Sequence, residues 1–162
     1  MRQSFNRRAP TPPIAIPLSL LGLLPFVLFG LGSVGHIPEI ADRMLVLLID
    51  YAALILAFAG GVHWGLGLPP GATRPSLRLG AGVLPMIVAW IALSLAHLWS
   101  PYGALTVLIL GYLATVLTEH RAATRGLVPR GYVWTRWGFS LIAVGLMAMV
   151  MVLRGVGQTI VF

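Results

Sequence analysis

The sequence predicts an all-α, polytopic membrane protein, built as a bundle of about five transmembrane helices. Of its 162 residues, 58% are hydrophobic and only 9% are charged, whereas soluble domains carry about 25% charged residues. The hydrophobic residues also gather into five runs, each near the roughly 20 residues that a helix needs to cross the hydrocarbon core. Too few polar residues are present to cover a water-facing surface, so the apolar surface is expected to face lipid.

The five runs are expected to be helices rather than the strands of a barrel. They lack the period-two alternation of barrel strands, and a segment inside lipid has to satisfy its backbone hydrogen bonds internally. The predicted helices cover residues 14–35, 44–66, 79–99, 102–118 and 137–153. Together they define a transmembrane domain over residues 14–154, with one tail at residues 1–13 and another at residues 155–162.

The first two runs differ in character. The run at 14–35 follows three arginines, as the apolar part of a signal peptide does, but its 22 residues exceed the usual length of about 7–15. It is therefore expected to stay in the protein as a helix. The run at 44–66 is uncharged except for Asp50, which makes this helix the most informative one for function.

The last three runs are separated by short loops. A turn at Pro101 joins the runs at 79–99 and 102–118. A loop that contains Pro129 precedes the run at 137–153. Proline and glycine in such loops mark turns, and short loops predict that consecutive helices pack as antiparallel neighbours.

The arginines predict the orientation, because short cytoplasmic loops accumulate Arg and Lys. All eleven basic residues are Arg. Nine of them fall on one side of the predicted bundle: Arg2, Arg7, Arg8, Arg74, Arg78, Arg121, Arg125, Arg130 and Arg136. Only Arg43 and Arg154 fall on the other side. We therefore expect a cytoplasmic N-terminal tail and an external C-terminal tail. The use of Arg without Lys suggests a GC-rich bacterial genome, so the expected location is the bacterial inner (cytoplasmic) membrane.

Several classes of function are disfavoured by what the sequence lacks. The absence of Cys excludes disulfides, Cys-ligated zinc, iron–sulfur clusters and thiol catalysis. The net charge of +7 does not indicate a nucleic-acid partner, because the charges lie between apolar runs and not in one basic patch. No catalytic motif occurs, and no two histidines have the i,i+4 spacing of a metal-binding helix. We therefore expect no enzyme activity, no cofactor and no metal.

Small residues form a ridge on the second predicted helix. At 100° per residue, Ala53, Ala57, Gly61 and Gly65 follow one another at four-residue spacing, and ridges of this kind let helices approach closely. We expect the ridge to pack against another helix. Asp50 falls within about 60° of every member of the ridge, so its side chain is expected to point into the bundle.

Asp50 and its neighbour Tyr51 are the polar candidates of the outer half of this helix. A charged carboxylate at the bilayer centre costs at least about 2.5–3.5 kcal/mol, so it has to be paired, protonated or close to water. Arg154 and His97 are the expected partners on the outer side. Such a carboxylate could serve as a proton or cation site, or as a structural contact between helices.

Two further polar residues are expected at the inner end of the bundle. His63 lies near the end of the second predicted helix, and Glu119 follows the end of the fourth. They could form a cluster that handles protons or binds a ligand. Alternatively, they are polar residues that lie at the level of the lipid headgroups.

The second predicted helix also resembles the signature helix of a known family. The segment from Tyr51 to Gly65 reads YAALILAFAGGVHWG, and this pattern is similar to that of the domain-of-unknown-function 3429 family, the transmembrane protein 69-like proteins. Leu84-Pro85 resembles the Leu-Pro of the family's third helix. The resemblance covers residues 14–153 and implies a five-helix architecture in the inner membrane, with no reaction attached to it.

The resemblance continues, less closely, at the other end of the chain. Glu119 stands where an Asp is common in the family. Residues 128–136 are similar to a Pro-x-Trp-Tyr-x-x-Arg-x-Arg segment, with Gly131 in place of its Trp and Trp134 in place of its first Arg. Arg136 keeps the second Arg of that segment.

The function expected first is that of a non-enzymatic accessory, assembly or structural partner of a larger membrane complex. The chain has almost no mass outside the predicted helices, so its partners are expected to be the lipid bilayer and other membrane subunits or a second copy. The alternative is a small proton-coupled transporter or carrier that uses Asp50, His63 and Glu119. A quinone- or haem-binding redox protein ranks third.

The orientation can be tested with reporter fusions. A reporter enzyme that works only outside the cytoplasm should be active when fused after Phe162 and inactive when inserted in the loop at residues 67–78. A reporter that works only in the cytoplasm should give the opposite pair of results. If the external reporter is silent after Phe162 while the cytoplasmic one works there, the assignment is wrong.

Overall fold

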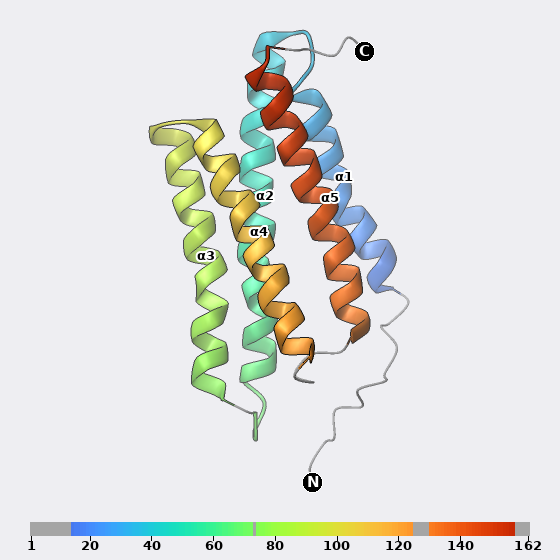
Figure 1. The fold of residues 1–162 in the computed structure, drawn as a ribbon, viewed down its shortest axis with the longest axis vertical. Helices are drawn as coiled ribbons and strands as arrows, with labels where there is room; N and C mark the ends of the chain where they lie inside the picture. The colour runs from blue at the N-terminus through green and yellow to red at the C-terminus, as the bar shows by residue number, and fades with distance from the viewer. Residues whose placement is uncertain (1–13, 73, 125–129, 158–162) are drawn as a thin grey trace.

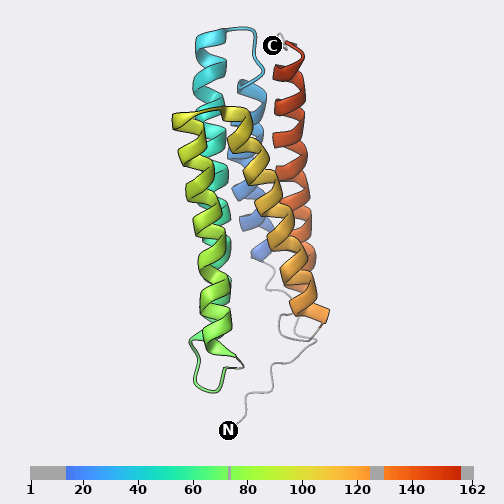
Figure 2. The same ribbon diagram turned by 60° about the vertical axis from the view of Figure 1, so that its left-hand side comes forward.

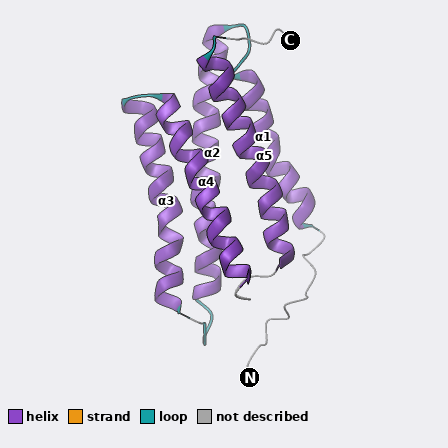
Figure 3. Cartoon of the chain, viewed as in Figure 1, coloured by secondary structure: helices purple, strands orange, loops and turns teal. Residues whose placement is uncertain are grey.

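The computed structural model of the chain describes residues 14–72, 74–124 and 130–157. These residues form five α-helices joined by short loops (Figures 1 and 3), which confirms the predicted all-α class. The helices are α1 (Ala15–Gly32), α2 (Pro38–Gly67), α3 (Pro75–Leu98), α4 (Pro101–Thr124) and α5 (Arg130–Gly155). The predicted tail at residues 1–13, most of the tail at 155–162, and Val128-Pro129 of the family segment lie outside the described residues.

The five helices form a closed ring with one additional contact across it. Each helix packs against the next one in the chain, and α5 returns to pack against α1. α2 also contacts α4 across the ring, so α2 touches three other helices. α1, α3 and α5 begin at one end of the bundle, here called the base (lower in Figure 1), and α2 and α4 begin at the other end, the top; Figure 2 shows the same alternation from a second side.

Four of the described helices are long and apolar enough to cross a membrane: α2, α3, α4 and the part of α5 from Val133 to Gly155. α1 has a shorter apolar stretch, Ile16–Gly32. At 1.5 Å per residue, the 18 residues of α1 span about 27 Å, close to the hydrocarbon thickness of about 30 Å. The chain is thus a membrane protein with several spans, and the fifth span remains a prediction for α1.

Four helices extend beyond the hydrophobic runs that predicted them. α2 begins at Pro38 and not at residue 44, and α3 begins at Pro75 and not at residue 79. α4 continues to Thr124, and α5 begins at Arg130. Charged residues ended the runs in the sequence but do not end the helices. At the start of α2, Pro38 occupies the first turn, where its missing N–H is not needed, and Glu39 lies at the positive end of the helix dipole.

The core of the bundle is built around an aromatic cluster. Phe26 of α1 is fully buried and makes edge contacts with Tyr51, Tyr112 and Phe139, at ring-centroid distances of 5.2, 6.2 and 5.8 Å. The Tyr51 hydroxyl donates to the carbonyl oxygen of Gly22 at 2.8 Å, and the Tyr112 hydroxyl to that of Ala52 at 3.0 Å. Both tyrosines therefore bury their rings without leaving a hydroxyl unsatisfied.

α2 and α3 approach each other most closely at a pair of glycines. A Cβ atom built on Gly60 would lie 2.0 Å from the carbonyl oxygen of Gly82, and a Cβ on Gly82 would lie 2.5 Å from the indole of Trp64. Only glycine fits at these two positions, because any side chain would meet backbone or a ring. Backbone approach through small residues is the usual way in which helices associate in lipid.

Alanine substitutions at two adjacent glycines should distinguish this contact from the neighbouring surface. Gly60→Ala places a methyl group against the α3 backbone and should lower stability by about 1–3 kcal/mol, as overpacking does elsewhere. Gly61→Ala meets nothing within 4 Å and should be neutral or slightly stabilising, since alanine favours helix. Thermal unfolding of the purified variants in mild detergent measures both effects. Equal stability of the two variants would contradict the contact.

Candidate functional site

The clearest polar site inside the bundle is an ion pair between α4 and α5. Arg136 Nε lies 3.5 Å from Glu119 Oε2, and the side chains are only 11% and 3% exposed, respectively. Glu119 shares its face of α4 with the buried residues Tyr112 and Val116. Two opposite charges that have both lost water are held by each other, and removal of one leaves the other uncompensated. The pair therefore fastens the base of α4 to α5.

Several buried hydrogen-bond donors lie on α5, at Arg136 and in the turn that follows it. The Nε and Nη2 atoms of Arg136, the Nε1 atom of Trp137 and the hydroxyl of Ser140 are buried, and none has a hydrogen-bond partner in the part of the chain that the structure describes. The Trp137 ring also makes an edge contact with His120, at 5.7 Å between centroids. Since the geometry between Arg136 and Glu119 is long for a hydrogen bond, charge attraction holds the pair.

His63 reaches the same end of the bundle as this ion pair. It is half-buried and lies on the face of α2 that buries Leu56 and Ala59. Leu66, less than one turn further, packs against Ala123 of α4 and Val133 of α5. The described residues show no hydrogen bond or ion pair between His63 and Glu119, because Glu119 faces the guanidinium of α5. His63 and Glu119 therefore lie at the same end of the bundle without a hydrogen bond or ion pair between them. The ionic partner of Glu119 is Arg136.

The base of α2 is capped by an arginine of α3. Arg78 donates from Nη1 to the carbonyl oxygen of Leu66 at 3.1 Å. A cation at the C-terminal end of a helix satisfies a free carbonyl and interacts favourably with the helix dipole. Arg78 therefore joins the start of α3 to the end of α2.

Asp50 lies at the edge of the packed face of α2 and not inside the bundle. It is half-buried; its helix neighbour Ala53 is buried, but Val46, Leu47 and Leu54 are all exposed. In the described residues Asp50 has no hydrogen bond and no ion pair. A carboxylate at this position borders lipid on one side, where leaving it charged and alone is costly.

The expected partners of Asp50 are engaged elsewhere or too far out, which corrects the sequence prediction. Arg154 forms a short ion pair with Asp42 and donates to the carbonyl oxygen of Ser33 at 2.7 Å, and His97 is exposed near the top of α3. The reason is the early start of α2. Asp50 is twelve residues from Pro38, about 18 Å along the axis at 1.5 Å per residue, so Asp42 takes the level at which Arg154 lies.

The ridge of small residues on α2 divides into a packed part and an open part. Ala53 is buried and Ala57 is half-buried. A Cβ atom on Gly61 or Gly65 would meet nothing within 4 Å. The prediction that all four residues pack against another helix is therefore wrong within this chain. The close contact lies at Gly60, one residue and about 100° away.

The sequence interpretation missed Arg136 as a site residue. It precedes the predicted fifth helix by one residue, so it was assigned to a loop, whereas α5 begins at Arg130 and carries it inside the bundle. The available signal was the family segment, which retains Arg136, together with the acidic residue at Glu119. For metal binding, no three His, Asp or Glu side chains come together within residues 14–72, 74–124 and 130–157.

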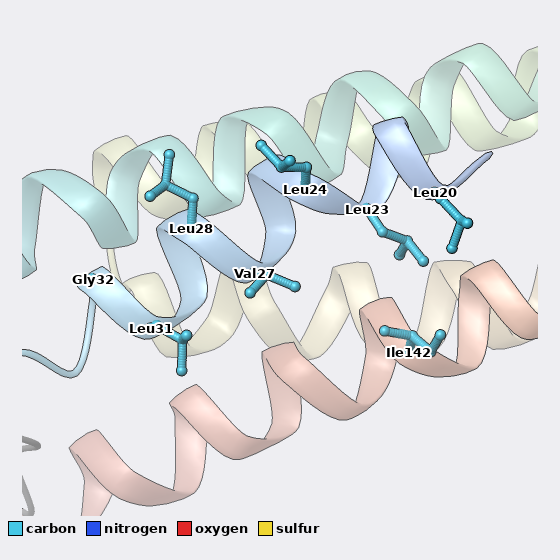
Figure 4. Close-up of a pocket in the computed structure, with 8 residues that line it drawn as sticks. All are labelled: Leu20, Leu23, Leu24, Val27, Leu28, Leu31, Gly32 and Ile142. Carbon is cyan, nitrogen blue, oxygen red and sulfur yellow. The ribbon is translucent and has the colours of Figure 1, made fainter. Parts of the chain in front are cut away.

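An apolar groove lies between α1 and α5. Its volume is about 790 Å³, and it is open along its length. It is lined by Leu20, Leu23, Leu24, Val27, Leu28, Leu31, Gly32 and Ile142. Figure 4 shows the α1 side chains spread along one side of the groove, with Ile142 of α5 opposite. With aliphatic side chains and one glycine as its lining, the groove offers contact to hydrocarbon but no polar chemistry.

A comparison with protein families agrees with the resemblance noted in the sequence. Residues 11–152 match a family described as "Protein of unknown function (DUF3429)". This range includes all of α2, α3 and α4, both members of the ion pair, and the greater part of α5. No solved structure matches the chain.

Two vertebrate proteins named Transmembrane protein 69 are similar to part of the chain. The one from Xenopus tropicalis is 34% identical over 98 residues, and the one from Mus musculus is 29% identical over 97 residues. Each alignment covers 57% of this chain. The matched region spans 37% of the frog protein and 38% of the mouse protein, so both relatives are much longer than the similarity.

The ion pair can be tested by removing its members singly and together. Glu119→Leu or Arg136→Leu alone leaves one buried charge and should cost several kcal/mol, about 3–5 in soluble proteins. The double variant should recover much of that loss, because no lone charge remains. Arg121→Leu, on the exposed side of α4, serves as the control and should be near neutral. Thermal unfolding in mild detergent gives the coupling, and strictly additive losses would contradict the pair.

Proposed function

The chain belongs to the DUF3429 family of proteins of unknown function, and we propose that it serves as a non-enzymatic accessory or assembly subunit of a larger membrane complex. In this role its described helices form a rigid bundle, and one side of α2 receives a helix of another protein. The proposal rests on geometry alone, since the family and the relatives carry no activity that could be transferred.

One observation carries the proposal: α2 is tightly packed on one side and open on the adjacent side. Gly60 leaves no room for even one methyl group, whereas Gly61 and Gly65 have nothing within 4 Å of a built Cβ. Small residues exposed on a membrane helix allow another backbone to approach closely. The open glycines share a side of α2 with Asp50, which has no ionic partner among the described residues, and this supports a contact with another protein.

The use of the interior polar groups also favours an assembly role. Tyr51, Tyr112, Glu119 and Arg136 are each engaged in a contact that joins two helices. A proton-coupled carrier would need Asp50, His63 and Glu119 as exchangeable sites. Glu119 is held by Arg136, and Asp50 lies at the edge of α2, which supports the assembly role over the carrier.

The orientation and location belong to the same proposal. The base of the bundle carries Arg74, Arg78, Arg121 and Arg136 among its described residues, whereas the top carries Arg43 and Arg154, the latter paired with Asp42. The asymmetry of arginines supports a base that faces the cytoplasm, with the N-terminus inside and the C-terminus outside. The use of Arg without Lys supports a location in the bacterial inner membrane.

Purification from native membranes in mild detergent tests the proposal. The wild-type chain should co-purify with a stoichiometric membrane subunit. The variant Gly61→Leu with Gly65→Leu should lose that subunit while its own thermal unfolding stays unchanged, because the new side chains occupy open space. Gly145→Leu on α5 is a matched control, since it also has nothing within 4 Å, and it should retain the subunit.

Other outcomes of the same purification reject the proposal. A wild-type chain that purifies alone as a monomer leaves no complex to assemble. Retention of the subunit by the doubly substituted variant shows that the α2 face does not bind it. A Soret band in the purified wild-type protein would instead favour a haem-binding redox protein.

A further inference from the structure

We propose that the helix docked on α2 belongs to a different protein and carries an Arg or Lys side chain that pairs with Asp50. This inference rests on the proposed function, because it names the chemistry of the partner at the open side of α2. It assigns to Asp50 the role of a contact residue for another chain, distinct from a proton carrier within the bundle.

At its position along α2, the Asp50 carboxylate cannot easily reach the water at either membrane surface. Asp50 lies seventeen residues before Gly67 and seven after the exposed Arg43, so about 10.5 Å of helix separates it from the charged residues at the top. Because the short carboxylate side chain cannot snorkel over such a distance, its charged form needs a partner at its own depth.

The described part of this chain does not supply that partner. Arg154 is bound to Asp42 and to the Ser33 carbonyl oxygen, and Arg136 is bound to Glu119 at the base. Arg43 lies on α2 itself, seven residues and about 10.5 Å nearer the top. A cation for Asp50 therefore has to come from outside the described chain.

The open face beside Asp50 has the shape for such a partner. Gly61 lies about 20° from Asp50 around the helix, three turns nearer the base, and Ala57 lies on the same side. The exposed neighbours Val46 and Leu54 frame the carboxylate with apolar surface. A partner helix that packs against Gly61 and runs along α2 can place a basic residue near the level of Asp50, with the stem of its side chain against the apolar frame.

A second copy of this chain does not satisfy the same requirement. Two copies that pack through this face about a twofold axis present the same surface to each other, which brings one Asp50 toward the other. Like charges repel in such an arrangement, and the exposed residues around Asp50 are apolar. Charge complementarity therefore favours a foreign helix with a basic residue.

Substitutions at Asp50 test the pairing in the complex purified from native membranes. Asp50→Asn and Asp50→Leu should each lower recovery of the partner subunit at least tenfold, whereas Asp50→Glu should retain most of it. Glu39→Gln, an exposed acidic residue at the start of α2, is the matched control and should leave recovery unchanged. Thermal unfolding of each purified chain shows whether the bundle itself is affected.

Cross-linking and charge exchange then identify the partner residue. The chain has no cysteine, so Leu54→Cys provides a single attachment point for a short cross-linker in native membranes. The cross-linked peptide should contain a transmembrane Arg or Lys, and its exchange for Asp, combined with Asp50→Arg, should restore recovery of the partner. Restoration by the double exchange, with loss in each single exchange, is the expected result.

The outcomes separate this inference from the proposed function. If the wild-type chain has no partner subunit, the proposed function fails and the inference with it. If Gly61→Leu releases the subunit but Asp50→Asn does not, only the inference fails. A cross-link at Leu54→Cys to a second copy or to lipid alone, a partner helix without a basic residue, or an isolated chain destabilised by Asp50→Asn would each also overturn it.

Discussion

Inside lipid the hydrophobic effect does not drive helices together. This bundle therefore depends on a few places where helices pack closely or form polar contacts with each other. α2 takes part in most of them. It meets α3 through Gly60 and Gly82, binds α1 through the Tyr51 hydroxyl, and receives the Tyr112 hydroxyl of α4. α5 joins the assembly differently, through the ion pair at the base and through Arg154 at the top. The ring is held by short-range contacts that apolar burial alone would not supply.

The small number of polar contacts inside the bundle also indicates which polar residues are free to interact with other molecules. Each buried hydroxyl or charge that joins two helices is committed to the fold, because breaking it leaves a polar group in lipid. Among the described carboxylates away from the helix ends, Asp50 departs from this rule: it borders the packed face and has no ionic partner in the described part of the chain. The exposed side of α2 is therefore a better candidate for contact with other molecules than the expected inner cluster of His63 and Glu119.

The helices could be predicted from the sequence because hydrophobic runs of spanning length leave few alternatives. Their ends could not, since Asp42, Arg121 and Arg136 interrupt a hydrophobic run without interrupting a helix. The early start of α2 displaced the expected partner of Asp50. The ridge was misassigned because spacing identifies which small residues share a face, while only the positions of neighbouring helices decide which face is packed. Predicting the pairing of Glu119 with Arg136 would have required both the true start of α5 and the position of α4 beside it.

The contacts of α5 bear on how the protein is made. Arg154, near the end of α5, holds the carbonyl oxygen of Ser33 at the end of α1 and the side chain of Asp42 in α2. Phe26 of α1 is fully enclosed only once Phe139 of α5 lies against it. Because α5 is the last helix to be synthesised, α1 and α2 reach the membrane before these contacts can form. Closure of the ring therefore has to follow the synthesis of α5, and a chain that stops before α5 lacks the contacts that close it.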